Sequence, residues 1–229
     1  MTSSNVVYQD FDAEAFGVPF YRIVDVFAED LHEDLNRLMA QPPIVIDAKL
    51  KAGNRDIDCL LQEKGFRKIC TQINLAHFLD TDETVDEHIS VNRALDLTES
   101  QIKTHAENFV FDRFSLDALL PRSGGKILYC NWIRNSVCGK RKELIAISNS
   151  FCSFSDEDET LRIDLVSVLE KRKNIGRNLL AALVNEAKAR RKSRIEVVTE
   201  CENQAAWRLY IRSGFRLSQF YSVFHYVDL

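Results

Sequence analysis

The pattern of apolar residues changes from strand-like to helix-like in the C-terminal third of the chain. Leu161, Ile163 and Leu165 alternate with polar residues, as in a β-strand with one buried face. After a basic turn at residues 171–176, apolar residues recur at three- and four-residue spacing over residues 179–187, which indicates an amphipathic helix. A strand–turn–helix directs backbone N–H groups and the positive end of the helix dipole to one point. The turn is therefore predicted to bind an anion such as a phosphate or pyrophosphate.

The same pattern continues toward the C-terminus. Residues 195–199 alternate as a second strand, so residues 161–199 are expected to form a right-handed parallel βαβ unit. Asn203 is expected to cap a further helix that ends at Gly214, and residues 220–226 alternate as a final strand.

A smaller α/β domain is predicted for residues 1–80, followed by an acidic connection at 81–97 and a C-terminal domain at 98–229. The expected elements of the smaller domain are extended segments within 6–27, helices at 31–39 and 57–64, and strands at 44–46 and 66–75. A helix–Gly–Phe–strand segment occurs twice, at residues 61–67 and 210–216. It indicates either a coincidence or a degenerate half-repeat.

The first part of the C-terminal domain is expected to be mainly helical. Thr98 and Gln101 form a capping box for a helix whose apolar face lies within residues 102–110. His105 lies beside that face and is expected to be a core histidine. The other expected elements are an irregular segment at 111–121, a helix at 126–138 that ends at Gly139, a strand-like run at 143–154 without a clear turn, and a hairpin loop at 155–160.

Charge is distributed unevenly around a net charge of −4. Residues 161–229 hold 13 Lys and Arg against 7 Asp and Glu, whereas the other 160 residues hold 17 against 27. A basic C-terminal third fits an anionic ligand, but the acidic chain as a whole disfavours a nucleic acid polymer. No apolar run approaches the roughly 20 residues of a membrane span, and the N-terminus does not resemble a signal peptide. Six scattered cysteines without C-x-x-C indicate thiols in a reducing cytoplasm and no metal site.

Dinucleotide, P-loop and G-x-S-x-G motifs are absent, which leaves the basic turn and a second segment, N-Q-A-A-W-R-L-Y-I-R-S-G-F. Together they resemble the GCN5-related N-acetyltransferase (GNAT) family, whose motifs are [QR]-x-x-G-x-[GA] and Asn-x-x-A-x-x-x-Tyr-x-x-x-Gly-Phe. In the first, Lys171 replaces Gln or Arg, and Asn174 replaces a Gly but tolerates left-handed backbone angles. The second is matched by Asn203, Ala206, Tyr210, Gly214 and Phe215.

Further segments are similar to the dTDP-fucosamine acetyltransferase branch, strongly over residues 95–229 and weakly over 10–80. They are Phe16-Gly17, Gly65-Phe66, Arg113-Phe114 and residues 129–135. This resemblance implies a GNAT fold, with a mixed central sheet splayed between two parallel strands, beside the smaller N-terminal α/β domain. It also implies a cytoplasmic enzyme of cell-surface polysaccharide biosynthesis, compatible with a homodimer. The enzyme would move an acetyl or short hydroxyacyl group from coenzyme A to the amine of a dTDP-linked amino-dideoxy sugar.

The resemblance assigns roles to residues near both motifs. Backbone groups near Val166 and Val168 would grip the pantetheine arm and polarise the thioester carbonyl. Asn203 would bind the same arm, and Tyr210 would protonate the departing thiolate as general acid. Amides of the turn would hold the pyrophosphate, so the expected coenzyme A contacts also include Lys171, Arg172, Lys173, Asn174, Ile175, Gly176 and Arg177.

Three points stay open at this level. Glu200 and His225 are candidates for the general base, and a water relay is equally compatible with the sequence. The acceptor pocket is expected to draw on Arg113, Tyr129, Trp132 and Asn135. The alternative functions are acylation of another amine (a protein, a polyamine or an aminoglycoside) and a non-catalytic interaction module that binds coenzyme A poorly.

Overall fold

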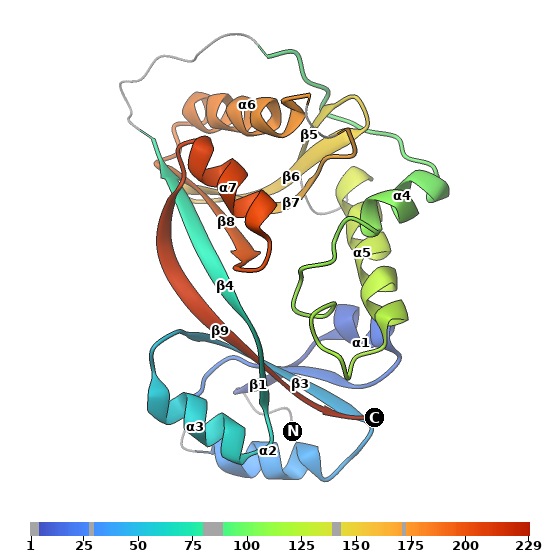
Figure 1. Cartoon of the computed structure of the whole chain (residues 1–229), viewed down its shortest axis with the longest axis vertical. Coiled ribbons are helices and arrows are strands. Elements are labelled where there is room, and N and C mark those ends of the chain that lie inside the picture. The colour runs from blue at the N-terminus through green and yellow to red at the C-terminus, as the bar shows by residue number, and fades with distance from the viewer. Residues whose placement is uncertain (1–4, 28–29, 80–88, 139–142, 171–172) are drawn as a thin grey trace. The chain divides into compact units, whose positions relative to one another are not determined.

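The computed structural model describes residues 5–27, 30–79, 89–138, 143–170 and 173–229 (Figure 1). The chain divides into two compact units. Unit 1 comprises Met1–Gln72, Phe111–Leu128 and Phe220–Leu229, and unit 2 comprises Ile73–Val110 and Tyr129–Gln219. This division differs from the predicted domains, because residues 111–128 and the C-terminal residues 220–229 group with the N-terminal part. Residues 80–88 of the predicted acidic connection lie outside the described residues, and residues 89–97 belong to unit 2.

Unit 1 contains a four-strand arrangement in the order β1-β2-β3-β9. β2 and β3 are parallel, whereas β1 with β2 and β3 with β9 are antiparallel. Its elements are β1 (Val6–Tyr8), α1 (Asp10–Phe16), β2 (Phe20–Ile23), α2 (Leu31–Met39), β3 (Ile44–Lys51) and α3 (Arg55–Glu63), with the first residues of β4 (Arg67–Phe78) and α5 (Arg122–Val137) and most of β9 (Arg216–Asp228).

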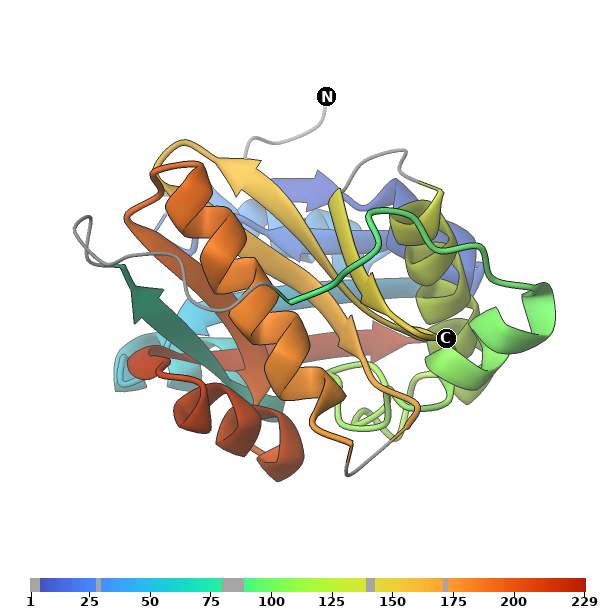
Figure 2. The ribbon, with the colours of Figure 1, turned by 90° about the horizontal axis from the view of Figure 1, so that it is seen from above.

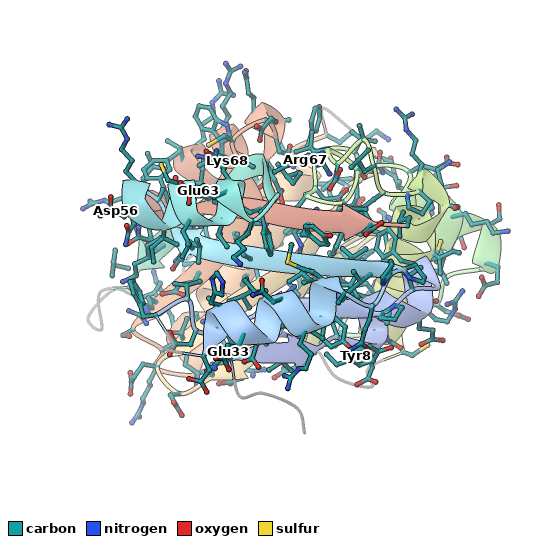
Figure 3. The ribbon with its side chains drawn as sticks, turned by 90° about the horizontal axis from the view of Figure 1, so that it is seen from below. Tyr8, Glu33, Asp56, Glu63, Arg67 and Lys68 are labelled. Carbon is teal, nitrogen blue, oxygen red and sulfur yellow. The ribbon has the colours of Figure 1, made fainter. Side chains whose placement is uncertain are left out.

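The core of unit 1 lies between its strands and the pair α2 and α3, which cover one strand face side by side (Figure 3). Leu31 and Leu35 of α2 and Leu61 of α3 pack against Ile46 of β3 and Phe224 of β9. Glu33 and Asp56 lie on the outer side of these helices. Side chains alternate along a strand, so the neighbours of Ile46 and Phe224 on β3 and β9 point to the opposite face.

Extended segments are present within residues 6–27 as β1 and β2, but the helix α1 between them was not predicted. Phe11 and Phe16 give the sequence a strand-like appearance, but Ala13, Glu14 and Ala15 between them favour a helix. The helix ends where Gly17 adopts φ +71°, and the Gly17 N–H donates to the Ala13 carbonyl at 2.8 Å. A left-handed glycine of this kind is a common helix end.

Unit 2 has the strand order β4-β8-β7-β6-β5, and α6 lies across β5, β6 and β7 (Figure 2). β7 and β8 are parallel with α6 between them in sequence, which confirms the predicted βαβ unit. The elements of unit 2 are the end of β4, α4 (Glu99–Ala106), most of α5, β5 (Glu143–Ile147), β6 (Ser150–Glu157), β7 (Thr160–Ser167), α6 (Ile175–Ala189), β8 (Arg194–Glu200), α7 (Gln204–Arg212) and the start of β9.

Three details of unit 2 differ from the sequence prediction. The strand-like run at 143–154 is a hairpin of β5 and β6, because Ser148 turns the chain with a φ of +52° and no Gly or Pro marks the turn. α4 has the predicted capping box but ends at Ala106, before Phe109 and Val110. α5 begins at Arg122 rather than at residue 126, and Gly139, its predicted stop, lies outside the described residues.

β7 and β8 separate along their length. They pair over Thr160–Ile163 and Arg194–Val197, and then β7 continues to Ser167 and β8 to Glu200 beyond the paired part. These ends do not pair with each other, although β7 still pairs with β6 up to Ser167, and they therefore open a gap between two parallel strands, as the predicted fold class requires. The core of unit 2 lies around this gap and is built from β6, β7, α6, β8 and α7, with Leu179 and Leu183 fully buried.

The order β2-α2-β3-α3-β4 matches the order β7-α6-β8-α7-β9, and the first two strands of each series are parallel. The ends of α3 and α7 also match. Gly65 and Gly214 adopt φ +86° and +88°, and the N–H groups of Phe66 and Phe215 donate to carbonyls five residues earlier at 2.9 and 3.1 Å. Both ends are Schellman motifs. The shared order favours the half-repeat over coincidence.

Alanine at the two matching glycines is expected to destabilise the protein unequally. Gly65→Ala should lower the free energy of unfolding by about 1–2 kcal/mol, because both positions have a positive φ. Gly214→Ala should cost roughly 1 kcal/mol more, since its Cβ would lie 2.8 Å from Cε1 of His77. The His77 ring is held by the Ser213 carbonyl at 3.1 Å from Nδ1. Urea unfolding of both variants measures the difference, and equal losses would contradict the close approach.

Within the described residues, none of the six cysteines forms a disulfide. Within the described ranges, no helix is both long and apolar enough to cross a membrane.

Candidate active site

The unpaired ends of β7 and β8 form the centre of the candidate site in unit 2. On β7 the opening begins after Ile163, and the chain then passes through Val166 and Val168, both half-buried against the core. On β8 it begins after Val197 and ends at Glu200, which is buried. Strand ends without a mutual partner keep backbone N–H and C=O groups available for an extended ligand.

α6 begins beside this opening with its N-terminal N–H groups outside the helix ladder. Asn174 adopts φ +58° and ψ +8° as the N-cap residue, and its side chain makes no capping hydrogen bond. The first intrahelical bond runs from the Asn178 N–H to the Asn174 carbonyl at 2.9 Å, so the amides of residues 175–177 precede it. Asn174 thus adopts the left-handed conformation that an asparagine tolerates in place of the glycine of the family motif. The positive end of the helix dipole and these amides suit a phosphate or pyrophosphate.

Gly176 lets three elements meet at the start of α6. A Cβ at this position would lie 3.0 Å from Cδ2 of Leu209 on α7 and 3.6 Å from Cγ2 of Val168. Glycine therefore allows the first turn of α6 to lie directly against α7 and the end of β7. The same contacts fix the amides of the turn relative to the opening between the strands.

Two basic side chains of the turn, those of Lys173 and Arg177, lie within the described residues. Lys173 is exposed and paired with Glu170, whose carboxylate lies 2.6 Å from Nζ. Arg177 is exposed and lines a cavity of about 820 Å³ together with Asn178 and Arg212. Lys171 and Arg172 lie outside the described residues. Among the described residues of the turn, the backbone of residues 174–177 is thus the feature that lies beside the opening.

Substitutions at Asn174 are expected to separate backbone conformation from side-chain chemistry. Asn174→Gly should keep acetyl-CoA affinity within about twofold, whereas Asn174→Val should lower it about tenfold because a β-branched residue resists positive φ. Arg191→Val is the matched control, because Arg191 has φ +56° at the other end of α6. Calorimetric titration measures all three, and equal affinities for Gly and Val at residue 174 would contradict the role of the turn.

Tyr210 lies in the core of unit 2, on α7 one residue after Leu209. Its side chain is 5 % exposed and packs against Phe215 with ring centroids 5.5 Å apart. Burial raises the Tyr210 pKa, and the nearby Cys152 and Glu200 raise it further. A tyrosine in this setting keeps its proton at neutral and mildly alkaline pH, which suits a general acid.

Asn203 and Glu200 sit where β8 passes into α7. The Asn203 side chain accepts a hydrogen bond from the Ala206 N–H at 3.3 Å, so it caps α7 as predicted. The Asn203 N–H donates to the Glu200 carbonyl at 3.0 Å, which brings the two residues together at the end of β8. Their roles in binding and proton transfer stay predictions.

The aromatic residues predicted for the acceptor pocket stack on one another. Tyr129 lies between Phe109 and Trp132, with ring centroids 4.4 and 5.7 Å away. Tyr129 is buried, whereas Trp132 and Asn135 are half-buried on the same helix, α5. The stack gives α5 a rigid aromatic surface within unit 2.

Arg113 and His225 belong to unit 1. Arg113 lies 3.3 Å from the Asp47 carboxylate and 3.7 Å from that of Asp12. His225 is fully buried, and its Nδ1 is 2.9 Å from Oδ2 of Asp117. The roles predicted for Arg113 and His225 stay predictions.

One polar pair near the opening could not be predicted from the sequence. His105 is fully buried, as expected, and its Nδ1 is 2.7 Å from Oγ of Ser167 at the end of β7. Burial lowers the His105 pKa, which keeps the imidazole neutral. The two residues are 62 positions apart, and no local pattern links them.

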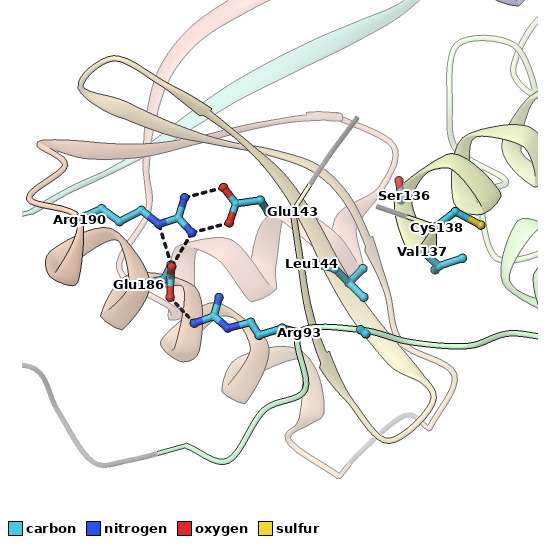
Figure 4. Close-up of a pocket in the computed structure, with 9 residues that line it drawn as sticks. Arg93, Ser136, Val137, Cys138, Glu143, Leu144, Glu186 and Arg190 are labelled. Atoms are coloured by element: carbon cyan, nitrogen blue, oxygen red, sulfur yellow. Dashed lines mark hydrogen bonds and ion pairs between the residues drawn. The ribbon is translucent and has the colours of Figure 1, made fainter. Parts of the chain in front are cut away.

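A second cavity of unit 2, of about 630 Å³, lies between α5, β5 and α6 and contains none of the predicted site residues (Figure 4). Its arginines are neutralised by carboxylates. Arg190 pairs with Glu143 and Glu186, and Arg93 pairs with Glu186. This network ties α6 to β5, and both arginines that line the cavity among the described residues are paired with carboxylates. Among the residues that the structure describes, no group of three or more His, Cys, Asp or Glu side chains is arranged to hold a metal ion.

The sequence of the region that forms this site matches a known protein family. Residues 150–215, which carry the opening, the turn and Tyr210, match the Acetyltransferase (GNAT) family. The chain is 28% identical over 173 residues to a dTDP-fucosamine acetyltransferase of Escherichia coli O6:H1, covering 74% of this chain and 75% of that protein. It is 27% identical over 136 residues to the spore coat polysaccharide biosynthesis protein SpsD of Bacillus subtilis, covering 56% of this chain and about half (47%) of that protein.

A solved structure shows the same fold. The GCN5-related N-acetyltransferase from Sphaerobacter thermophilus superposes with a TM-score of 0.58 at 14% identity, over 97% of this chain and 76% of that chain. The family match, the fold and the separated parallel strands agree with one another. Residues 150–215 therefore form a segment that matches the GNAT acetyltransferases within a GNAT fold, and these matches support an acyl-CoA-dependent N-acyltransferase.

Proposed function

We propose that the protein moves an acetyl or short hydroxyacyl group from coenzyme A to the amine of a dTDP-linked amino-dideoxy sugar. The observation that carries the acceptor class is the match to a dTDP-fucosamine acetyltransferase, which extends over 173 residues and so well beyond the family segment. The second relative is named for polysaccharide biosynthesis, which agrees with a sugar acceptor.

The donor is assigned to the opening between β7 and β8. The pantetheine arm would lie along the side of β7 that no longer pairs with β8, near Val166 and Val168, with Asn203 beside it. The pyrophosphate would accept hydrogen bonds from the amides of residues 174–177 at the start of α6. Gly176 fits this assignment, since a side chain there would meet Leu209 and Val168. These residues suit an extended, anionic donor such as acyl-CoA.

The proposed reaction is a direct transfer. The neutral amine attacks the thioester carbonyl carbon, the C–N bond forms, and the C–S bond breaks. Tyr210 donates its phenolic proton to the departing thiolate, and backbone N–H groups of β7 stabilise the oxyanion. The proton lost by the amine passes to a base, for which Glu200, His225 and a water relay are the candidates. No covalent enzyme intermediate is required.

A panel of acceptors tests the proposed substrate class. The release of free coenzyme A from acetyl-CoA is measured with dTDP-linked amino sugars, spermidine, an aminoglycoside and a lysine peptide. We expect kcat/KM to be at least about tenfold higher for a dTDP-linked amino sugar than for the other amines, since binding of the nucleotide contributes to specificity. A higher kcat/KM for spermidine, the aminoglycoside or the peptide would replace the proposed acceptor. Binding of acetyl-CoA without turnover of any amine would instead favour a non-catalytic module.

A cytoplasmic location and a homodimer are part of this proposal. Light scattering on the purified chain measures its mass directly against the 26.3 kDa of a monomer.

A further inference from the structure

The strands of unit 1 carry a buried charged group on the face opposite α2 and α3. Asp47 of β3 and His225 of β9 are direct partners across the antiparallel pair, so their side chains lie next to each other on one face. Both are almost completely buried, with exposures of 1 % and 0 %. Their neighbours Ile46 and Phe224 point to the other face, into the core with α2 and α3.

One ring nitrogen of His225 already has a hydrogen-bond partner. Nδ1 is 2.9 Å from Oδ2 of Asp117, and Oδ1 of Asp117 accepts a hydrogen bond from Arg67 at 2.6 Å. Burial raises the Asp117 pKa, but the hydrogen bonds from His225 and Arg67 outweigh it and bring the pKa to about 2. Because an ionised carboxylate only accepts hydrogen bonds, Nδ1 carries the hydrogen. In the neutral imidazole, Nε2 is then an acceptor.

One carboxylate oxygen of Asp47 also has hydrogen-bond partners. Oδ2 accepts hydrogen bonds from Arg22, 2.8 Å from its Nη2, and lies 3.3 Å from the Arg113 guanidinium. Burial raises the Asp47 pKa, but Arg113 and Arg22 outweigh it and hold the pKa below its usual range. Asp47 is therefore ionised, and its second oxygen is also an acceptor.

These second atoms, Oδ1 of Asp47 and Nε2 of His225, have no hydrogen-bond partner in the part of the chain that the structure describes. Two neighbouring buried acceptors without a donor are unfavourable, because neither regains the hydrogen bond that it made to water. We infer that Asp47 and His225 together form a binding point for a primary amine. One nitrogen with two N–H groups can donate to both acceptors, whereas a hydroxyl group has a single hydrogen to donate.

The charges around the two acceptors favour the neutral form of the amine. Asp12, Asp47 and Asp117 are balanced by Arg22, Arg67 and Arg113, so there is no surplus negative charge for an ammonium ion. Burial raises the Asp12 pKa, against the effect of Arg113 and Arg22, which reduces the negative charge further. An ammonium ion in solution would therefore lose one proton to bulk water, and the neutral amine that remains would donate its N–H groups to the two acceptors.

Arg22 and Arg113, the arginines paired with Asp47, are partly exposed to solvent. Their side chains are 33 % and 20 % exposed, whereas Asp47 is buried beneath them. The choice of an amine as the ligand rests partly on the proposed N-acyltransferase function. The observation of two unpaired acceptors is independent of that function. The amine can be the acceptor of acyl transfer or a separate effector, since both share the same chemistry.

Side-chain nitrogen NMR of the full chain tests the inference without a variant. His225 is expected to show the Nδ1–H tautomer, and its Nε2 resonance should shift when ethylamine is added at pH 9. Trimethylamine, which in neutral form has no N–H group, should leave the resonance unchanged. The absence of a shift with ethylamine, or an equal shift with trimethylamine, would overturn the site.

Matched variants locate the amine on these residues. Asp47→Asn is expected to weaken ethylamine binding about tenfold, as for the loss of a hydrogen bond to a charged group. Asp56→Asn is the control, because Asp56 is exposed in the same unit. His225→Gln should abolish the response, and His32→Gln, on α2, should preserve it. Unchanged affinity in Asp47→Asn would contradict the inference. If the two site variants do not fold, the NMR measurement on the unmodified chain still decides.

Two further measurements separate this inference from the proposed function. Acetyl-CoA should bind the unmodified chain and His225→Gln with equal affinity. Donor binding without an ethylamine shift overturns the inference alone, whereas an ethylamine shift without donor binding overturns the proposed function alone. In the transfer assay, ethylamine that competes with the sugar acceptor identifies the site with the acceptor amine. Inhibition or activation that is not competitive identifies a separate effector amine.

Discussion

Tyr210→Phe is expected to lower kcat by about 10²- to 10³-fold, the range typical for the loss of a general acid, while acetyl-CoA affinity stays within about twofold. The substitution removes only the hydroxyl group, and the ring keeps its packing against Phe215. Steady-state kinetics and calorimetry separate the two effects. Tyr8→Phe, at an exposed position in unit 1, is the matched control and should change neither. Unchanged kcat in Tyr210→Phe would remove this residue from the mechanism.

The pH dependence gives an independent test of the same role. An unperturbed tyrosine loses its proton near pH 10. Burial raises the Tyr210 pKa, so the protonated, proton-donating form persists to a higher pH than in a free tyrosine. Between about pH 8 and pH 10, kcat should therefore show no fall caused by ionisation of Tyr210. A decline in kcat over this range that is absent from Tyr210→Phe would contradict the raised pKa.

Gly176→Val is expected to weaken acetyl-CoA binding by about 10²-fold, which corresponds to the loss of one or two charge-assisted hydrogen bonds. Even a Cβ would approach Leu209 to 3.0 Å, and the branched Val side chain would also meet Val168. The start of α6 must then move away from α7 and from the end of β7. The amides of the turn would lose their position relative to the opening between the strands.

A control and an intermediate variant define this effect. Gly125→Val makes the same change in α5 within unit 1, where a Cβ meets other atoms only at 4.0 Å, and should leave acetyl-CoA affinity unchanged. Gly176→Ala should fall between the unmodified chain and Gly176→Val, because the end of the Leu209 side chain can shift by a few tenths of an ångström. Normal affinity in Gly176→Val would show that the donor does not depend on the start of α6.

Local patterns predicted the segment from β7 to α7 well. The switch from alternation to helical spacing, the N-cap at Asn203 and the glycine end at Gly214 are encoded within a few residues of each other. The left-handed Asn174 follows from its replacement of a glycine in the family motif. The turn and the helix that carries Tyr210 could therefore be predicted from local patterns, whereas the opening between β7 and β8 follows only from the family resemblance.

Long-range pairing could not be predicted from the same patterns. β9 follows α7 in sequence but pairs with β3, about 180 residues earlier, and this pairing brings residues 220–229 into unit 1. The neighbours of His225, namely Asp47 and Asp117, depend on this pairing and on an irregular loop. Likewise, Ser148 forms a tight turn without the Gly or Pro that usually marks one. Tertiary contacts rather than local propensity decide these features.

The central claim is that this chain transfers an acyl group from coenzyme A to a nucleotide-linked amino sugar. Mass spectrometry of a dTDP-linked amino-dideoxy sugar after incubation with isotopically labelled acetyl-CoA tests it most directly. The claim predicts that the nucleotide sugar gains the mass of one labelled acetyl group, and that Tyr210→Phe forms far less of this product in the same time. An unchanged mass for every amino sugar, under conditions in which acetyl-CoA binds the protein, would contradict it.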